Sequence, residues 1–380
     1  MELRIVQRVA LSTYFFLTGL CFATWASRIP TIKTYFNFNE AELGTILLAM
    51  PISSMIGLPI SGWIVSKFNS RIPIIISFIA FSISLILIGY STSPFLLITA
   101  ICVFSFCMRI LNISTNTQSI TLQKQYKKKI VSSFHGLWST GGLVGVAFST
   151  IMVKFNISIA HHLLTVALFS LVIAIISFFY LMKGDKSTTG NKLIIGKPDP
   201  FIFYLGILVF IAAICEGGMF DWSGVYFKEV VHEDIFTYGY LSFMTCMALS
   251  RFFSDRLMDF VGMQKTYILS AILIATGVST AIFFPTFWPS LLGFCLIGIG
   301  TAPIFPMTFL LAGTSSKYSP GMAISIITTY AIVGMLIGPP LIGYLAHAFG
   351  LKSAFFIFVF MGLSFILVSK LLFIYKKKMN

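Results

Sequence analysis

The sequence predicts an all-α membrane protein with about twelve transmembrane helices, and two observations support this prediction. First, 57% of the 380 residues are hydrophobic and only 10% are charged, whereas a soluble domain carries about a quarter charged residues. Second, the apolar residues come in runs close to the roughly 20 residues that one span needs. Such runs form helices in lipid, because a helix satisfies its own backbone hydrogen bonds. The strands of a β-barrel would alternate in polarity, and these runs do not.

Polar turns separate the apolar runs along the whole chain. The predicted spans are 5–27, 41–66, 72–91, 94–118, 131–153, 158–182, 201–227, 238–258, 265–284, 287–313, 321–346 and 351–374. The first run follows two arginines, as in a signal peptide, but it lacks a convincing small-residue cleavage site. We therefore interpret it as a retained first span.

The longest polar stretch, 183–200, predicts a linker between two halves, 1–182 and 201–380, with six spans each. The halves also resemble each other. The turn GWIVSKFNSRI (62–72) returns about 193 residues later as DRLMDFVGMQK (255–265), and GGLVG (141–145) returns as VGMLIG (333–338). Repetition at half length is expected of transporters built from duplicated bundles.

The distribution of Lys and Arg predicts that both termini lie in the cytoplasm. With the N-terminus inside, most of the 26 basic residues fall at inside ends. The outside ends then carry only Arg28, Lys33, Lys154, Lys228 and Lys352. An odd number of spans would break this alternation. Because the net charge of +14 comes from span ends, we expect no nucleic-acid partner.

The turn between the second and third spans resembles the major facilitator superfamily, whose loop reads roughly G-x-x-x-D-R-x-G-R-R. Gly62, Lys67 and Arg71 fit this pattern. The first copy of the turn has lost the acid and the central glycine, whereas the second copy keeps them as Asp259 and Gly262.

Five longer strings look like the bacterial fucose-permease-like branch of that family. They are WASRIPTIK (25–33), NTQSI (116–120), SSFHGLWSTGGLVG (132–145), EGGMFDWSGVY (216–226) and PGMAISIITTYAIVGMLIGPPLIGY (320–344). The resemblance implies two pseudo-symmetric six-helix bundles around a central cavity, lined by spans one, four, seven and ten. It also implies alternating access and a place in the bacterial inner membrane.

Glu216 is the leading candidate for proton coupling and for substrate binding. It lies about 15 residues into the seventh span, or roughly 22 Å along a helix, and charges inside a membrane are rare and often functional. A carboxylate there could bind and release a proton, or accept hydrogen bonds from substrate hydroxyls. The alternative is a structural ion pair or a neutral buried acid. The following Gly217 and Gly218 would allow close approach or local unwinding.

Arg109, Asn112 and Asn116 are candidate substrate-binding residues, because their spacing places them on one face of the fourth span. The stripe could bind an anionic or polyhydroxylated substrate, or control Glu216. A helix–helix hydrogen-bond network explains it equally well.

His135, near the cytoplasmic end of the fifth span, is a second candidate for proton coupling, because histidine titrates near neutral pH. Packing or gating is the alternative. His135 and Ser139 could also form the catalytic pair of an intramembrane hydrolase, but the sequence has no GxSxG nucleophile elbow around Ser139. Trp25 could stack on a sugar face or anchor the first span at the interface.

Small residues and prolines mark candidate moving parts, because they permit close helix approach and interrupt helices. The candidate gating or hinge residues are Gly141, Gly145, Pro303, Pro306, Gly334 and Gly338. The pair Pro339–Pro340 is also expected to interrupt the eleventh span. Plain packing is the alternative for the glycines.

The chain has no P-loop or nucleotide fingerprint, so we expect an ion gradient, protons first, to supply the energy. The favoured function is proton-coupled uptake of a small polar solute such as a sugar or sugar derivative. The alternative is a proton-antiport exporter of drugs or metabolites, and a remote one is a membrane-embedded enzyme or scaffold. We expect no enzymatic activity, no cofactor and no metal site. The expected partners are a small-molecule substrate, protons and the lipid bilayer, and the expected state is a monomer.

Overall fold

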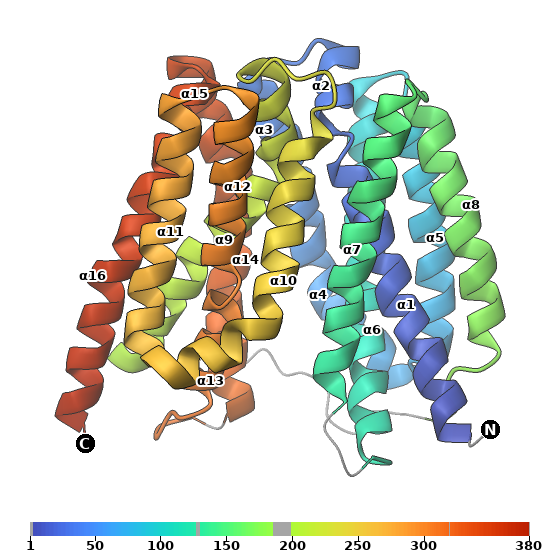
Figure 1. Ribbon diagram of the computed structural model, residues 1–380. Helices are drawn as coiled ribbons and strands as arrows, with labels where there is room; N and C mark the ends of the chain where they lie inside the picture. Colours follow the sequence, from blue (N-terminus) through green and yellow to red (C-terminus); the bar gives the residue numbers. More distant parts are fainter. Residues whose placement is uncertain (1–2, 127–129, 185–198, 319, 380) are drawn as a thin grey trace. The chain divides into compact units, whose positions relative to one another are not determined.

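The computed structural model describes residues 3–126, 130–184, 199–318 and 320–379, and the regular secondary structure of these residues is all helical (Figure 1). The helices are α1 (Leu3–Ala26), α2 (Ile29–Phe36), α3 (Glu40–Leu47), α4 (Ala49–Lys67), α5 (Arg71–Gly89), α6 (Pro94–Gln123), α7 (Val131–Lys154), α8 (Ile159–Phe178), α9 (Pro200–Glu229), α10 (Thr237–Val261), α11 (Met263–Phe283), α12 (Phe287–Thr301), α13 (Ile304–Ala312), α14 (Pro320–Phe349), α15 (Leu351–Ala354) and α16 (Phe356–Met379). Each predicted span corresponds to one of these helices or to a consecutive pair.

Eleven helical segments in the described ranges are long and apolar enough to cross a membrane. The helix for the predicted eighth span, α10, is not among them, although it is 25 residues long. Hydroxyl-bearing side chains in its first half and the cations Arg251 and Arg256 lower its hydropathy. The chain is thus a multi-pass membrane protein.

Proline accounts for two of the observed helix breaks, but a third break expected at a proline pair is absent from the described helices. The second predicted span divides at Leu48, just before Pro51, and the tenth divides between α12 and α13 at Pro303. Proline removes a backbone donor and clashes with the carbonyl four residues earlier. The expected interruption at Pro339–Pro340 is wrong, because both prolines lie inside the unbroken helix α14. Neighbouring helices allow proline within a membrane helix.

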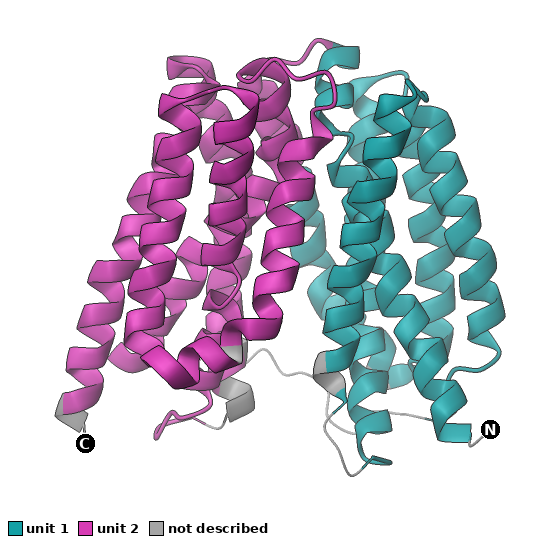
Figure 2. Cartoon of the chain, in the orientation of Figure 1, with its two compact units in different colours: residues 1–36, 49–192 teal, residues 37–48, 193–380 magenta. Residues whose placement is uncertain are grey.

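The chain divides into two compact units (Figure 2). Unit 1 is residues 1–36 and 49–192, and unit 2 is residues 37–48 and 193–380. The short helix α3 therefore groups with the second half of the chain. Most of the predicted linker, 185–198, lies outside the described residues, so its role stays a prediction.

Within unit 1, α1 and α7 pack closely through glycine. A Cβ atom at Gly19 would lie 2.0 Å from the Trp138 carbonyl oxygen, and one at Gly141 would lie 2.0 Å from the Phe16 carbonyl oxygen. Only glycine leaves room for such an approach of two backbones. The same unit is held by buried hydrogen bonds such as that from the Tyr14 hydroxyl to the Ala174 carbonyl, 2.7 Å.

Within unit 2, α9 is the most enclosed helix and packs against α14, α16 and α10. A Cβ at Gly334 of α14 would lie 2.6 Å from the Phe210 carbonyl oxygen of α9. Helix α3 packs on α14 in the same manner, since a Cβ at Gly343 would lie 2.5 Å from the Glu40 carbonyl oxygen. Close glycine contacts thus fix the helices that surround α9.

Candidate functional site

Helix α9 begins with a strong start signal and continues without a break. The Asp199 side chain accepts a hydrogen bond from the Ile202 backbone N–H at 2.8 Å, and Pro200 occupies the first turn. Both features favour a helix start. The helix then runs for 30 residues, so the local unwinding considered at Gly217 and Gly218 is not observed. The carboxylate of Glu216 is therefore carried by a regular, buried helix.

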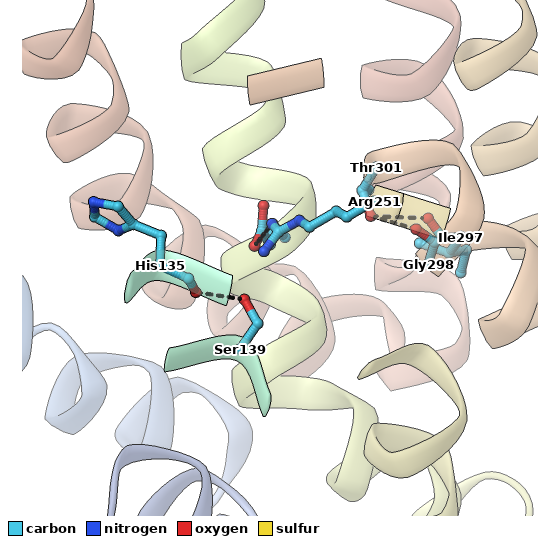
Figure 3. Close-up of polar contacts among 7 residues, drawn as sticks. His135, Ser139, Arg251, Ile297, Gly298 and Thr301 are labelled. Carbon is cyan, nitrogen blue, oxygen red and sulfur yellow. Dashed lines mark hydrogen bonds and ion pairs between the residues drawn. The ribbon is translucent and has the colours of Figure 1, made fainter. Parts of the chain in front are cut away.

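Glu216 forms an ion pair with Arg251 of α10. Arg251 Nη2 donates to Glu216 Oε1 at 3.1 Å, and Figure 3 shows the arginine side chain extended from its helix. Glu216 is 7% exposed, whereas the Arg251 side chain keeps 30% of its surface accessible. One carboxylate oxygen, Oε2, is buried without a hydrogen-bond partner. The pair is therefore neutral overall and offers one open acceptor.

Sequence reasoning placed Arg251 among the residues at cytoplasmic ends and missed this role. The structure extends α10 to Val261, which puts Arg251 about 15 Å before the helix end at 1.5 Å per residue. One signal was available. Tyr240, Met244, Met247 and Arg251 follow the three-and-four spacing of a single helix face, and an arginine on an otherwise apolar face of a membrane helix indicates an acidic partner.

The two glycines after Glu216 differ in their surroundings. A Cβ at Gly218 would lie 2.4 Å from the Phe358 ring, so this glycine permits close packing against α16. A Cβ at Gly217 would meet no atom within 4 Å. The space beside α9 at Gly217 is therefore open, whereas the neighbouring Glu216 carboxylate is enclosed.

The polar stripe predicted for the fourth span lies on α6 in unit 1. Arg109 Nε donates to the Ser54 hydroxyl of α4 at 2.7 Å. Asn116 Nδ2 donates to the backbone carbonyl of Asn112 at 2.7 Å, while Asn112 itself is exposed. Arg109 and Glu216 thus each have a described partner within their own unit. The binding role of the stripe stays a prediction.

Trp25 lies in the core of unit 1. It is 1% exposed, its Nε1 donates to the sulfur of Met50 at 3.2 Å, and its ring contacts that of Phe104. A sugar could stack on this ring only after these contacts had opened, so its predicted binding role requires a different conformation of the unit.

His135 is exposed near the start of α7, and its ring contacts Phe15 edge-on at 5.5 Å between centroids. The Ser139 hydroxyl donates to the backbone carbonyl of His135 at 3.3 Å (Figure 3). A hydrogen bond to this backbone carbonyl does not activate the serine as a nucleophile. Proton relay by His135 stays a prediction.

The candidate hinge residues occupy different structural positions. Gly141, Gly145 and Gly334 are at close helix contacts, whereas a Cβ at Gly338 would meet its nearest atom at an ordinary 3.7 Å. Pro303 lies at the break between α12 and α13, and Pro306 lies in the first turn of α13. Close packing accounts for the first three glycines, and the hinge role of all six residues stays a prediction.

A sequence model of the Major Facilitator Superfamily matches residues 11–259 and 236–379. The chain is 30% identical over 357 residues to the membrane protein MosC of Rhizobium meliloti, covering 93% of this chain and 87% of MosC. It is also 28% identical over 353 residues to an uncharacterised MFS-type transporter of Yersinia pestis, covering 92% of each.

Solved structures show the same fold at low sequence identity. A mutant of the nucleoside transporter NupG superposes with a TM-score of 0.79 at 14% identity, covering 96% of this chain and all of that one. A bacterial homologue of the human lysosomal transporter Spinster, in an inward-facing and unoccupied conformation, gives 0.75 at 14% identity, covering 97% of this chain and 98% of that one. At such identity the likeness concerns the fold alone.

Proposed function

Since the chain belongs to the Major Facilitator Superfamily and is a membrane transporter of that type, not an enzyme, we propose that it couples proton movement to uptake of a small polar solute, such as a sugar or sugar derivative. It works by alternating access in the bacterial inner membrane, with both termini in the cytoplasm. Apart from helix α3, the two compact units correspond, in this proposal, to the two repeated six-span halves.

The observation that carries the proposal is the buried Glu216–Arg251 pair with its open acceptor Oε2. Leaving a buried acceptor unpaired costs free energy. A solute hydroxyl that donates to Oε2 removes this cost on binding, and so does a proton on the carboxylate. Once protonated, the carboxyl group becomes a donor to which a solute hydroxyl can offer its own oxygen, so proton and solute can be bound together, as uptake with protons requires.

The charge of the pair favours a neutral solute. Arg251 balances Glu216, so a bound anion or cation would meet no uncompensated opposite charge from these two residues. Hydroxyl groups suit the pair better, because they accept from a guanidinium and donate to a carboxylate. The fucose-permease-like resemblance supports the same substrate class.

A thermal-shift screen of the purified protein tests the substrate class. The panel contains sugars, polyols, nucleosides, organic acids, amino acids and apolar cationic drugs, each measured on the wild type, Glu216→Gln and Arg109→Ala. A ligand that binds only the folded state raises its apparent stability by mass action. We expect stabilisation by a neutral polyhydroxylated solute and a weaker response of Glu216→Gln.

Other outcomes have defined meanings. Stabilisation by organic acids alone would refute the neutral-solute argument. Hits confined to apolar cations would favour the proton-antiport exporter. An equal response of Glu216→Gln and the wild type to a polyhydroxylated solute would place the binding site away from Glu216.

A further inference from the structure

Among the polar side chains of α9 and α10 that the proposed function does not use, Asp221 and Tyr240 are the ones considered for proton transfer. Asp221 lies five residues after Glu216 on α9, and Tyr240 lies on α10. Tyr240 is 2% exposed and its hydroxyl has no hydrogen-bond partner. The carboxylates of Asp221 and Glu216 both act electrostatically on that hydroxyl. Tyr240 therefore lies within the electrostatic reach of both acids.

Packing fixes the Tyr240 ring against α9. Its ring meets that of Phe220 at 5.8 Å between centroids in an edge-on arrangement. Phe220 lies between the two acids in sequence, one residue before Asp221 and four residues after Glu216. The ring therefore holds its hydroxyl beside the stretch of α9 that carries both acids.

The two acids differ in access to the medium. Glu216 is buried, whereas Asp221 is partly exposed. Five residues separate them by about 7.5 Å along the helix axis, with Asp221 nearer the end of α9 that the basic residues predict to face outward. A proton from outside would thus reach Asp221 before it could reach Glu216.

The packing of Tyr240 depends on its ring and not on its hydroxyl. A phenylalanine would keep the contact with Phe220, and an unpartnered buried hydroxyl costs free energy that a ring hydrogen would not. Buried polar groups in native proteins nearly always have a partner. The hydroxyl therefore has its partner in a ligand, a water molecule or another state of the protein.

We propose that Tyr240 conducts protons from Asp221 to Glu216, and this inference rests on the proposed role of Glu216 as the coupling site. Protonated Asp221 gives its proton toward the Tyr240 oxygen while the Tyr240 O–H gives its own proton toward Glu216 Oε2, each through a bridging water, because neither oxygen has a hydrogen-bond partner within the protein. Asp221 ends as a carboxylate, Glu216 as a carboxylic acid and Tyr240 as a neutral phenol. Rotation of the hydroxyl then resets the path.

Other titratable groups on the helices around α9 do not offer an equal path. The charge on Glu216 also acts on the neighbouring Cys215. Helix α13 carries no titratable side chain. On the remaining neighbours of α9, titratable side chains either contact other residues or are exposed. The former are Tyr330 beside Gly206, Tyr344 with Thr45, Tyr375 with Tyr204, Cys295 with Cys246, Tyr238 with Phe287 and Arg251 with Glu216. The exposed or half-exposed ones are Arg256, Asp259, His347, Lys352, Lys370, Lys376 and Lys377.

Time-resolved infrared spectroscopy of the reconstituted full-length protein tests the relay without a known substrate. A light-triggered caged acid lowers the pH, and the carboxylic-acid C=O band reports protonation. The component of this band that is missing in Glu216→Gln is assigned to Glu216. We expect Tyr240→Phe and Asp221→Asn to slow the rise of that component by about 100-fold, the lower end of what positioned proton transfer contributes. Its final amplitude should be unchanged in Tyr240→Phe.

Tyr238→Phe is the matched control. Tyr238 lies on the same helix and packs on Phe287 instead of Phe220. We expect wild-type kinetics in this variant. We also expect Tyr240→Phe to melt at or above the wild-type temperature, because the buried hydroxyl it removes makes no hydrogen bond within the protein.

The outcomes separate the relay from the coupling site. Wild-type kinetics in Tyr240→Phe, with a Glu216 band present, would overturn the relay alone. An equal slowing in Tyr238→Phe would overturn it too. If Glu216→Gln removed no band, the coupling site itself would be wrong and the relay would fall with it.

Discussion

Removing Arg251 should destabilise the protein more than removing any exposed cation nearby. Truncating one partner of a buried ion pair costs about 3–5 kcal/mol, because the other charge stays buried and uncompensated. The Arg251 side chain is 30% exposed, so solvent reaches one end of the pair. We therefore expect Arg251→Met to cost about 2–3 kcal/mol, below the range for a fully buried pair.

The loss of stability caused by Arg251→Met should be larger at high pH than at low pH. In Arg251→Met the unpaired Glu216 carboxylate can be neutralised by a proton, and the unfolded chain exposes the same group to water. The folded state of the variant thus binds the proton more readily than the unfolded state, so the deficit shrinks as the pH falls and grows as it rises.

The assay is the thermal midpoint of detergent-solubilised protein from pH 5 to pH 8, followed by the fluorescence of a size-exclusion profile. Arg256→Met is the control, since Arg256 is exposed on the same helix. The double variant Arg251→Met/Glu216→Gln should recover most of the loss, because no buried charge remains. Equal midpoints for Arg251→Met and Arg256→Met at every pH would refute the reasoning.

Two further predictions concern the packing of unit 1. Gly141→Ala places a methyl group 2.0 Å from a carbonyl oxygen of α1, so we expect a loss of folded protein on size-exclusion chromatography. In the control Gly136→Ala the new methyl group meets no atom within 4 Å, and the stability should rise by up to about 1 kcal/mol. Equal yields of the two variants would contradict the close α1–α7 contact. His162→Leu removes the nitrogen that accepts a hydrogen bond from the buried Arg28 Nε at 3.0 Å, and it should lower the stability by about 1–3 kcal/mol. His161→Leu, at an exposed position, is the control. Equal melting temperatures of the two variants would show that Arg28 needs no acceptor there.

Apolar runs located the long helices but not the short helix α2, because each span must satisfy its backbone within about 20 apolar residues and a short helix need not. The breaks were harder to predict. Pro303 ends a helix and Pro339 does not, although both lie in apolar runs. The difference depends on neighbouring helices, which a single sequence does not show.

The candidate site was predicted in part for a similar reason. A lone deep acid such as Glu216 is visible in the sequence. Its partner Arg251 is separated from it by 35 positions and lies near enough to a span end to resemble an interfacial cation. Trp25 illustrates the converse, because an aromatic residue near a span end looks the same whether it lines a cavity or, as here, fills a core.

Solute-driven proton movement in liposomes, compared between the wild type and Glu216→Gln, tests the central claim most directly. The solute is the one that the thermal-shift screen identifies, and Glu229→Gln, at the end of the same helix, is the control. We predict that wild-type and control proteins take up protons together with the solute. Glu216→Gln should bind the solute but move it without protons. Proton uptake at the wild-type ratio by Glu216→Gln would contradict the account.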